Sequence, residues 1–425
     1  MKLPDRQAGR EARTQKRSNP MAELATELTA LPSDSIIGDP TSLSASVPLF
    51  KVAMSEGAPE AAAEVLRSGY IGQGPKVEEF EARLATVLGN DSIATVNSAT
   101  SGLHLALHLM RGVTAGDGKP AVQDGDEILA TPLTCTATNW PILANRLRLK
   151  WVDVDPNTCN LDLDDLEAKI TPTTRGIMVV HWGGYPVDLT RLGEILDRAE
   201  EKYGFRPFVV EDCAHAWGST YQGQRLGNHG NIAVYSFQAI KHLTCGDGGL
   251  MVLPNAELKR RTKLQRWYGI DREGERADFR CEADIPEYGF KFHMNDISAS
   301  IGISNLATID TVIDRHKGNA AFYDKELANV SGIRTMERAG DRESSFWIYT
   351  TAVERRDDFM RMMGENGVAT SRVHERNDQH SCVSEFGVEM PNLISLVAEM
   401  VCIPCGWWVT DEDRERIADL IKAGW

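Results

Sequence analysis

Residues 207–254 read PFVVEDCAHAWGSTYQGQRLGNHGNIAVYSFQAIKHLTCGDGGLMVLP. Three apolar runs in this stretch, PFVV, IAVYSF and GGLMVLP, are rich in β-branched and aromatic residues and have the length of buried strands. Charged residues follow shortly after two of these runs, as the pair Glu211-Asp212 and as Lys241. In open α/β sheets, ligands bind beyond the carboxyl ends of the strands. The stretch therefore predicts a buried sheet and also the edge of that sheet at which a functional site lies.

The same pattern extends upstream of the quoted stretch. Short apolar runs alternate there with amphipathic helices, and residues 188–204 carry four apolar side chains in helical register. Continuous apolar strands that alternate with such helices are typical of a largely parallel sheet flanked by helices. We therefore expect a large α/β domain over residues 45–265. The other expected strands are SIATVNS (92–98), DEILATP (126–132), KWVDVD (150–155) and RGIMVVHW (175–182), and further helices are expected at 76–89 and from Thr100 onward.

The character of the sequence changes after about residue 266, where it becomes more helical and carries more surface charge. A strand-like run, FWIYTTAV, stands at 346–353. The final sixteen residues, TDEDRERIADLIKAGW, begin with the capping-type pair Thr410 and Asp413 and predict a terminal helix. We expect residues 266–425 to form a smaller α+β domain.

The N-terminal stretch differs from the rest of the chain. Residues 1–20 are basic, polar and nearly free of hydrophobic side chains, so they cannot bury enough surface to fold. We expect residues 1–44 to be a mobile extension, with Met21 as an alternative natural start. A mitochondrial presequence is the sharper alternative, but Asp5, Glu11 and the missing apolar face disfavour it. No apolar stretch follows the charged residues as in a secretory signal, so a cytoplasmic location is expected.

Composition excludes several classes of function. The chain of 425 residues has 46 basic and 61 acidic side chains and a net charge of −15, which disfavours a general affinity for nucleic acid or an anionic membrane. No apolar run is long enough to span a bilayer. The eight cysteines are scattered, and the C-x-x-C pair Cys402 and Cys405 has no second pair to complete a metal site. We expect reduced thiols and no bound metal.

Four places along the predicted carboxyl edge carry residues suited to chemistry. At the turn from strand to helix in 97–102, free backbone N–H groups and the hydroxyls of Ser98, Thr100 and Ser101 suit a phosphate, although the same residues serve an ordinary helix N-cap. Asp212 at the tip of a buried strand needs a cation or hydrogen-bond donors. A protonated pyridine nitrogen would be such a cation, and the pairing would keep a pyridine ring able to withdraw electrons. Alternatively, the Asp212 carboxylate caps the following turn.

The other two places hold a lysine and a histidine. Lys241 follows an apolar strand and precedes a glycine-rich turn. A lysine near cationic neighbours in a desolvated pocket loses its proton more readily and becomes a nucleophile for carbonyl groups, while a surface loop lysine is the alternative. His215 lies three residues beyond Asp212. Taken alone, it is equally explained as a core or turn histidine.

The order and spacing of these residues resemble a known family. From about Tyr70 to the C-terminus, the chain resembles the DegT/DnrJ/EryC1/StrS family, the pyridoxal-5′-phosphate (PLP) dependent sugar aminotransferases of fold type I. The pattern EDxAHAxG followed by SFxxxKxxTxGxGG is the most specific part of the resemblance. The matching stretches are YIGQGPKVEEFE, VNSATSGLHLAL, DEILATPLTCTATN, VDVDPNT, VVHWGGYPVDL, VVEDCAHAWGSTYQGQRLGNHG, YSFQAIKHLTCGDGGLMV and GFKFHMNDISASIG.

The resemblance implies a role for each matching residue. Lys241 stands at the Schiff-base position and would also carry the proton between Cα of the amino donor and C4′ of the cofactor. Asp212 matches the acid that pairs with the pyridine nitrogen, and His215 matches the residue that contacts the phenolic oxygen. The phosphate-binding residues are implied at Ala99 and Thr100, with Ser236 as a second phosphate ligand. The family also implies a homodimer whose active sites are shared between the two chains.

Three positions depart from the family pattern. Cys135 stands where an aromatic ring usually stacks on the cofactor. A thiol makes a smaller contact with the cofactor there, or a nearby tryptophan takes over the stacking. His293 stands where many members have an asparagine that reaches across the dimer to the phosphate, and a histidine can still donate a hydrogen bond. Trp182 is likewise not the commonest residue at its position. These departures bear on the substrate more than on the chemistry.

The reaction implied by the resemblance is a ping-pong transamination. Glutamate or glutamine would give its amino group to the cofactor, and a keto sugar, expected to be nucleotide-linked, would receive it. A PLP-dependent dehydratase of the same family and a non-catalytic PLP-binding regulatory protein are the alternatives. Lys241 disfavours the dehydratases that carry histidine there, and the complete set of Lys241, Asp212 and His215 disfavours the binding protein. A Rossmann-type dehydrogenase is excluded because no strand is followed by G-x-G-x-x-G.

Overall fold

The computed structural model describes residues 46–272, 274 and 284–425. Ser46–Trp425 form one compact unit, and only this unit is considered below. The extension expected over residues 1–44 lies outside the described residues. The expected division of the rest into domains at 265/266 stays a prediction.

A seven-stranded sheet forms the centre of the unit, in the order β1-β9-β8-β5-β4-β2-β3. Strand β9 runs antiparallel to both of its neighbours, and the pairs from β8 through to β3 are parallel. The α/β fold with a largely parallel sheet is thus confirmed. The strands are β1 (Ile93–Val96), β2 (Glu127–Ala130), β3 (Arg148–Trp151), β4 (Thr174–Val180), β5 (Phe208–Asp212), β8 (Ile232–Ser236) and β9 (Gly249–Val252).

Helices cover both faces of this sheet, because alternate side chains of each strand point to opposite faces. In β4, Met178 packs in the hydrophobic cluster with α4, whereas its neighbours Ile177 and Val179 pack with α6 and α7. The β8 residues Ala233 and Tyr235 face a further cluster that contains α3 and α9. The covering helices are α3 (Pro75–Leu88), α4 (Ala99–Leu109), α5 (Thr136–Ala144), α6 (Leu163–Lys169), α7 (Leu189–Tyr203), α8 (Ala256–Gln265) and α9 (Asp296–Leu306).

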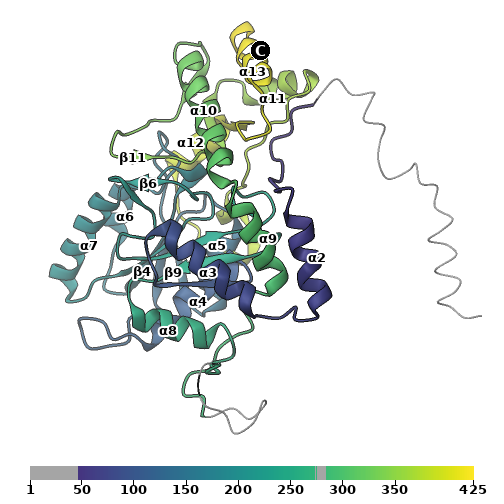
Figure 1. The fold of residues 1–425 in the computed structure, drawn as a ribbon. Coiled ribbons are helices and arrows are strands. Elements are labelled where there is room, and N and C mark those ends of the chain that lie inside the picture. The colour runs from purple at the N-terminus through teal and green to yellow at the C-terminus, as the bar shows by residue number, and fades with distance from the viewer. Residues whose placement is uncertain (1–45, 273, 275–283) are drawn as a thin grey trace, which may run out of the picture. The chain divides into compact units, whose positions relative to one another are not determined.

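The C-terminal part of the unit gathers at one end, in the upper part of Figure 1. Its antiparallel sheet has the order β10-β12-β13, and a second small sheet, β11-β6-β7, joins it to the loops of the large sheet. The terminal helix has the expected capping box of Thr410 and Asp413. These elements, with the helix that precedes α3, are α2 (Ala58–Ser68), β6 (Thr220–Tyr221), β7 (Gln224–Arg225), α10 (Ile309–Leu327), β10 (Ile333–Thr335), β11 (Arg342–Glu343), β12 (Tyr349–Val353), α11 (Arg356–Glu365), α12 (Pro391–Glu399), β13 (Met400–Ile403) and α13 (Asp411–Ala423).

The arrangement places several loops together at the carboxyl edge of the large sheet. The loops that follow β2, β4 and β5 all leave this edge because the three strands are parallel. Strand β8 is parallel to β5, so the glycine-rich turn between β8 and β9 starts from the same edge. Among the described residues, no helix is long and apolar enough to cross a membrane.

Helix α4 approaches the sheet closely at Gly102. A Cβ at this position would lie 2.7 Å from Val234 Cγ1 and 3.3 Å from both Met251 Cγ and Val96 Cγ2. We expect Gly102→Ala to lower the free energy of unfolding by about 1–3 kcal/mol, because an overpacked core must shift its backbone or side chains. Urea titration followed by circular dichroism measures this change. The matched control is Gly364→Ala in α11, where a Cβ meets nothing within 4 Å, and it should stabilise the protein by up to about 1 kcal/mol.

Candidate active site

Asp212 ends β5 and is 4% exposed. Its carboxylate accepts hydrogen bonds from Thr138 Oγ1 at 2.7 Å and from the Ala214 backbone N–H at 3.0 Å. Thr138 gives its only hydroxyl proton to Asp212, so the 2.8 Å contact with Thr134 Oγ1 must be donated by Thr134. Burial raises the pKa of Asp212, although these donors and the amine of Lys241 oppose the rise. The alternative expected from the sequence, a cap of the next turn, accounts for the hydrogen bond from Ala214 to Oδ1 of Asp212. It does not account for the hydrogen bond from Thr138 to Oδ2.

Lys241 lies in the turn between β8 and β9, where the residue as a whole is partly exposed while its amine is enclosed by protein. Its Nζ stands 3.5 Å from the centroid of the Trp347 ring. Burial lowers the pKa of Lys241 to about 7, although the negative charge of Asp212 opposes this. The sequence analysis attributed such a shift to cationic neighbours. The structure attributes it to desolvation, because the carboxylate beside the amine favours its protonated form.

His215 is 3% exposed, and its ring stacks on one aromatic ring and lies beside a second. The Trp347 ring lies 4.0 Å from it, centroid to centroid, and the His374 ring lies 5.5 Å from it. His215 Nδ1 accepts a 3.4 Å hydrogen bond from the Gly183 backbone N–H. The proton of the neutral ring therefore sits on Nε2, which is a donor. Burial, followed by the charge of Lys241, lowers the pKa of His215 well below its ordinary value, so the ring is neutral at pH 7.

The turn at the start of α4 lies next to β9. Ser98 is the N-cap of the helix, and its hydroxyl accepts the Ser101 backbone N–H at 3.1 Å. The first-turn N–H groups of Ala99 and Thr100 have no partner within the helix. Gly249 pairs with Ser236 across β9 and β8, and a Cβ on Gly249 would lie 2.7 Å from the Ala99 nitrogen. The absence of a side chain at Gly249 thus lets the backbone of β9 approach the N-terminus of α4 closely.

Cys135 and His293 have different surroundings. Cys135 precedes α5 and lies near the amine of Lys241. His293 packs against Trp267 with ring centroids 3.6 Å apart, and its Nδ1 is buried without a hydrogen-bond partner. Its contacts within the described part of the chain do not reach Lys241. The structure therefore brings together Lys241, Asp212, His215 and Cys135, and it leaves His293 apart from them.

Sequence analysis did not identify Trp347 or His374 as site residues. Trp347 was part of the expected strand 346–353, but β12 begins at Tyr349. His374 follows Val373, a β-branched residue at a φ of 68°, and this strained conformation is invisible in the sequence. Burial lowers the pKa of His374 to about 4. That a tryptophan takes over the stacking at the Cys135 position stays a prediction.

A buried cluster of His181, Glu211 and Cys213 lies beside the site, with its ligand atoms within 4.8 Å of one another. His181 Nδ1 accepts the Val187 backbone N–H at 3.0 Å, so Nε2 carries the ring proton and donates it to Glu211 at 3.0 Å. Asn231 Nδ2 donates to the other Glu211 oxygen at 2.8 Å. Hydrogen bonds thus occupy both nitrogens of the histidine and both oxygens of the glutamate. Through these hydrogen bonds the cluster joins the ends of β4 and β5.

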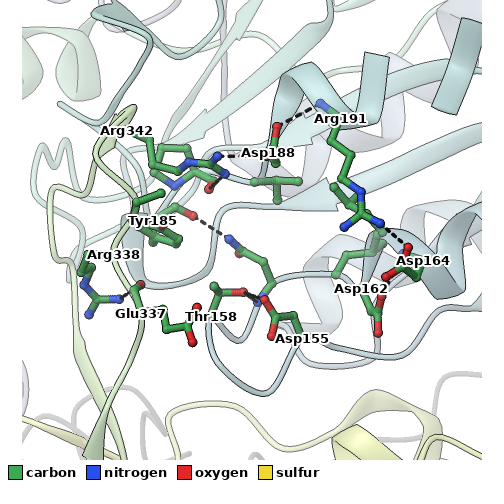
Figure 2. Close-up of a pocket in the computed structure, with 16 residues that line it drawn as sticks. Asp155, Thr158, Asp162, Asp164, Tyr185, Asp188, Arg191, Glu337, Arg338 and Arg342 are labelled. Carbon is green, nitrogen blue, oxygen red and sulfur yellow. Dashed lines mark hydrogen bonds and ion pairs between the residues drawn. The ribbon is translucent and has the colours of Figure 1, made fainter. Parts of the chain in front are cut away.

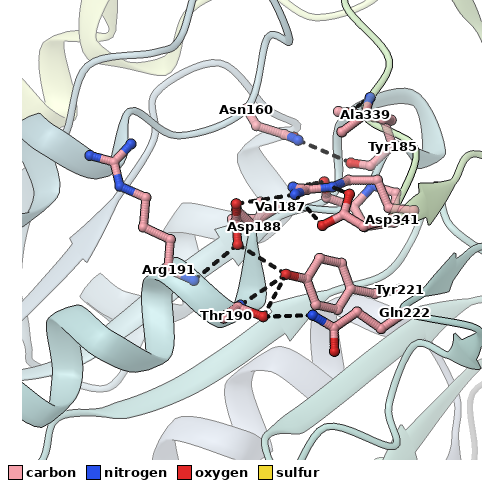
Figure 3. A network of polar contacts seen from close by, with 12 residues as sticks. Asn160, Tyr185, Val187, Asp188, Thr190, Arg191, Tyr221, Gln222, Ala339 and Asp341 are labelled. Atoms are coloured by element: carbon pink, nitrogen blue, oxygen red, sulfur yellow. Dashed lines mark hydrogen bonds and ion pairs between the residues drawn. The ribbon is translucent and has the colours of Figure 1, made fainter.

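A cavity of about 650 Å³ opens elsewhere, at the N-terminus of α7 (Figure 2). Two of its arginines are already paired, Arg191 with Asp164 and Arg342 with Asp188 at 3.1 Å. Asp188 also accepts hydrogen bonds from the Arg191 backbone and from Tyr221 Oη at 3.0 Å (Figure 3). These interactions join α7 to β6 and β11. The cavity contains none of the residues predicted for the site, and its paired charges serve the fold.

The residues at the carboxyl edge fit PLP. An anionic phosphate suits the N-terminus of α4, whose first-turn N–H groups have no partner within the helix and which packs against Gly249, the sheet partner of Ser236. A protonated pyridine nitrogen suits the buried carboxylate of Asp212, whose pKa is raised while no cation is bound to it. The Lys241 amine has a pKa of about 7, so a large share of it is neutral at pH 7 and able to attack a carbonyl carbon.

Comparison with solved structures agrees with this fit. The chain is 53% identical to AtS13 from Actinomadura melliaura, with 90% of this chain and 100% of the other covered and a TM-score of 0.85. It is 50% identical to the sugar aminotransferase CalS13 from Micromonospora echinospora, with 89% and 100% covered and a TM-score of 0.84. Spr1654 from Streptococcus pneumoniae, solved in its PLP form, is 25% identical, with 89% and 98% covered and a TM-score of 0.79. The model of the DegT/DnrJ/EryC1/StrS aminotransferase family matches residues 53–422, and the chain therefore belongs to this family and is a PLP-dependent transaminase.

Proposed function

We propose that the enzyme transfers the amino group of glutamate or glutamine to the keto group of a nucleotide-linked sugar, with Lys241 as the residue that attaches PLP. The observation that carries this proposal is the lowered pKa of Lys241, about 7, caused by burial beside the carboxylate of Asp212. Half of the amines are neutral at pH 7, whereas fewer than about one in a thousand would be neutral at the usual lysine pKa. The family supplies the reaction type.

When bound, PLP supplies an aldehyde that takes up amino groups and a ring that withdraws electrons from the carbon being deprotonated. Lys241 would hold PLP through its Nζ at the aldehyde carbon. In the transfer itself, Nζ would take the proton from Cα of the amino donor and return it at C4′. The amine can serve in both steps because its pKa lies near the working pH.

Asp212 and His215 hold the ring in the proposed arrangement. Asp212 pairs with the pyridine nitrogen, and the proton donated by Thr138 orients its carboxylate. His215 donates its Nε2 proton to the phenolic oxygen, since Nδ1 is engaged by Gly183. Ala99, Thr100 and Ser236 bind the phosphate, with Cys135 beside the ring in place of the usual aromatic residue.

We also propose that the enzyme is a homodimer with shared active sites. The family supports this, and the partly buried His293 stands where many members have an asparagine that reaches across the dimer to the phosphate. Burial, followed by the charges of Lys291 and Arg266, lowers the pKa of His293 to about 4, so it would act there as a neutral donor. A cytoplasmic location belongs to the same proposal.

The replacement Lys241→Ala tests the role of the lysine. We expect this variant to form no covalent adduct with PLP and to lose amino transfer from L-glutamate by a factor of at least about 100, the usual scale for a lost general acid–base group. Borohydride reduction followed by mass spectrometry of the peptide measures the adduct. The bleaching of the visible band of the loaded protein by L-glutamate, or by L-glutamine, measures the transfer.

Lys325→Ala is the matched control, because this lysine is exposed on α10. It should load PLP and react with the amino donor as the unmodified enzyme does. A Lys241→Ala protein that carries a reducible PLP adduct at another lysine and still turns over would contradict the proposed role.

The lowered pKa of Lys241 predicts a distinct pH dependence of cofactor attachment. The protonated amine cannot attack an aldehyde, so below pH 7 the rate of attachment should rise about tenfold per pH unit. Above pH 7 most of the amine is neutral, and the rate should level off. Stopped-flow absorbance between about pH 5.5 and 9 measures this, with Nα-acetyl-lysine as the control whose rate keeps rising. A protein rate that still rises about tenfold from pH 8 to pH 9 would show an ordinary lysine.

A further inference from the structure

Trp347 stands at the end of a strained turn. Phe346, the residue before it, has a φ of 52°, which is rare for a bulky side chain. Two buried histidines hold the turn in this conformation: His242 Nε2 donates to the Ser345 carbonyl at 3.0 Å, and His316 Nδ1 donates to the Phe346 carbonyl at 2.8 Å. Such strain persists only where the surroundings over-determine it, and it concentrates at functional sites.

The turn presents the indole of Trp347 to the residues around the amine. Its Nε1 donates to the Ile240 carbonyl at 2.8 Å, which fixes the backbone immediately before Lys241. The Lys241 Nζ lies 3.5 Å from the ring centroid, and the His215 ring stacks on the indole at 4.0 Å with an interplanar angle of 20°. The Trp347 backbone N–H donates to Gly183 at 2.9 Å, and Gly183 is the residue that donates to His215.

Packing alone does not account for this set of contacts. An indole that only fills the core needs a partner for its N–H, but any carbonyl would serve. Here the carbonyl, the amine and the imidazole all belong to the predicted catalytic residues or their immediate neighbours. A lysine side chain has four rotatable bonds, and packing of its amine against a ring face removes much of that freedom before its reaction partner arrives.

We propose that Trp347 is the positioning residue that holds the Lys241 amine and the His215 ring in place for PLP. This inference rests on the proposed role of Lys241. Trp347 would act on the rate at which the amine attacks, not on the affinity with which PLP first binds, because the contacts of Trp347 are made to Lys241 and His215 and not to the phosphate side at Gly249.

The experiment follows PLP attachment to the cofactor-free protein over a range of PLP concentrations. Saturation kinetics separate the half-saturating PLP concentration from the limiting rate of covalent attachment. Trp347→Leu removes the ring and should lower the limiting rate about tenfold or more, with the half-saturating concentration unchanged within twofold. Trp347→Phe keeps a ring and should lower the rate by no more than about threefold. Wild-type behaviour of both variants would overturn the proposal.

Trp425→Phe is the matched control, because that indole also donates to a backbone carbonyl, that of Glu354 at 2.7 Å, away from the site. It should leave both constants unchanged. If Trp347→Leu does not fold, the decision rests on Trp347→Phe and on fluorescence. Attached PLP should quench a tryptophan signal that Trp347→Phe lacks and Trp425→Phe retains. Equal quenching in all three proteins would place Trp347 away from the amine and overturn the proposal.

Lys241→Ala separates this outcome from failure of the proposed function. If that variant still forms the adduct, the role of Lys241 fails whatever Trp347 does. If the variant forms none and Trp347→Leu attaches PLP at the wild-type rate, the role of Lys241 stands and only the positioning role falls.

Discussion

An amine that is removed from water loses the hydration that stabilises its charge, and the Lys241 side chain is removed in this way at the carboxyl edge of the sheet. The loss has two consequences that depend on each other. The neutral amine becomes populated near pH 7 and therefore nucleophilic. The protonated amine must find partners, and the structure offers it the carboxylate of Asp212 and the π face of Trp347. The surrounding fold has to maintain both conditions.

The strand order explains how this is achieved. Parallel strands bring Asp212 and the loops after β2 and β4 to one edge, where hydrogen bonds from Thr138 and Gly183 orient the acid and the histidine. The single reversed strand, β9, then turns back from Lys241 so that Gly249 meets the start of α4. One short turn therefore links the amine to the place where an anion fits, and both are fixed to the same rigid sheet.

The sequence allowed the sheet and the residues on it to be predicted, because both leave local signals. Asp212 and Lys241 follow apolar runs, and the expected helices at 76–89 and 188–204 correspond to α3 and α7. Trp347 and His374 left no such signal. Their place in the site depends on a positive φ at Phe346 and at Val373, and on the way the C-terminal part packs against the strand ends. Long-range packing of this kind has no fixed spacing in the sequence.

Long-range packing also determines the pKa of Lys241. Its lowered pKa was expected from cationic neighbours, but the neighbours are a carboxylate and a thiol, and the shift comes from burial. Burial of a loop residue depends on what covers it, and the cover is supplied by Trp347 from a distant segment. For the same reason the sequence predicts residues for the candidate site but not the burial that lowers the pKa of one of them.

The indole that covers Lys241 comes from a segment made much later by the ribosome. Trp347 follows Lys241 by roughly 100 residues, which corresponds to roughly 5–20 s of synthesis at ordinary translation rates. Until then the indole that packs against the lysine in the folded protein does not exist. The arrangement of Lys241 against Trp347 therefore forms only after the chain has been made as far as the segment that carries the indole.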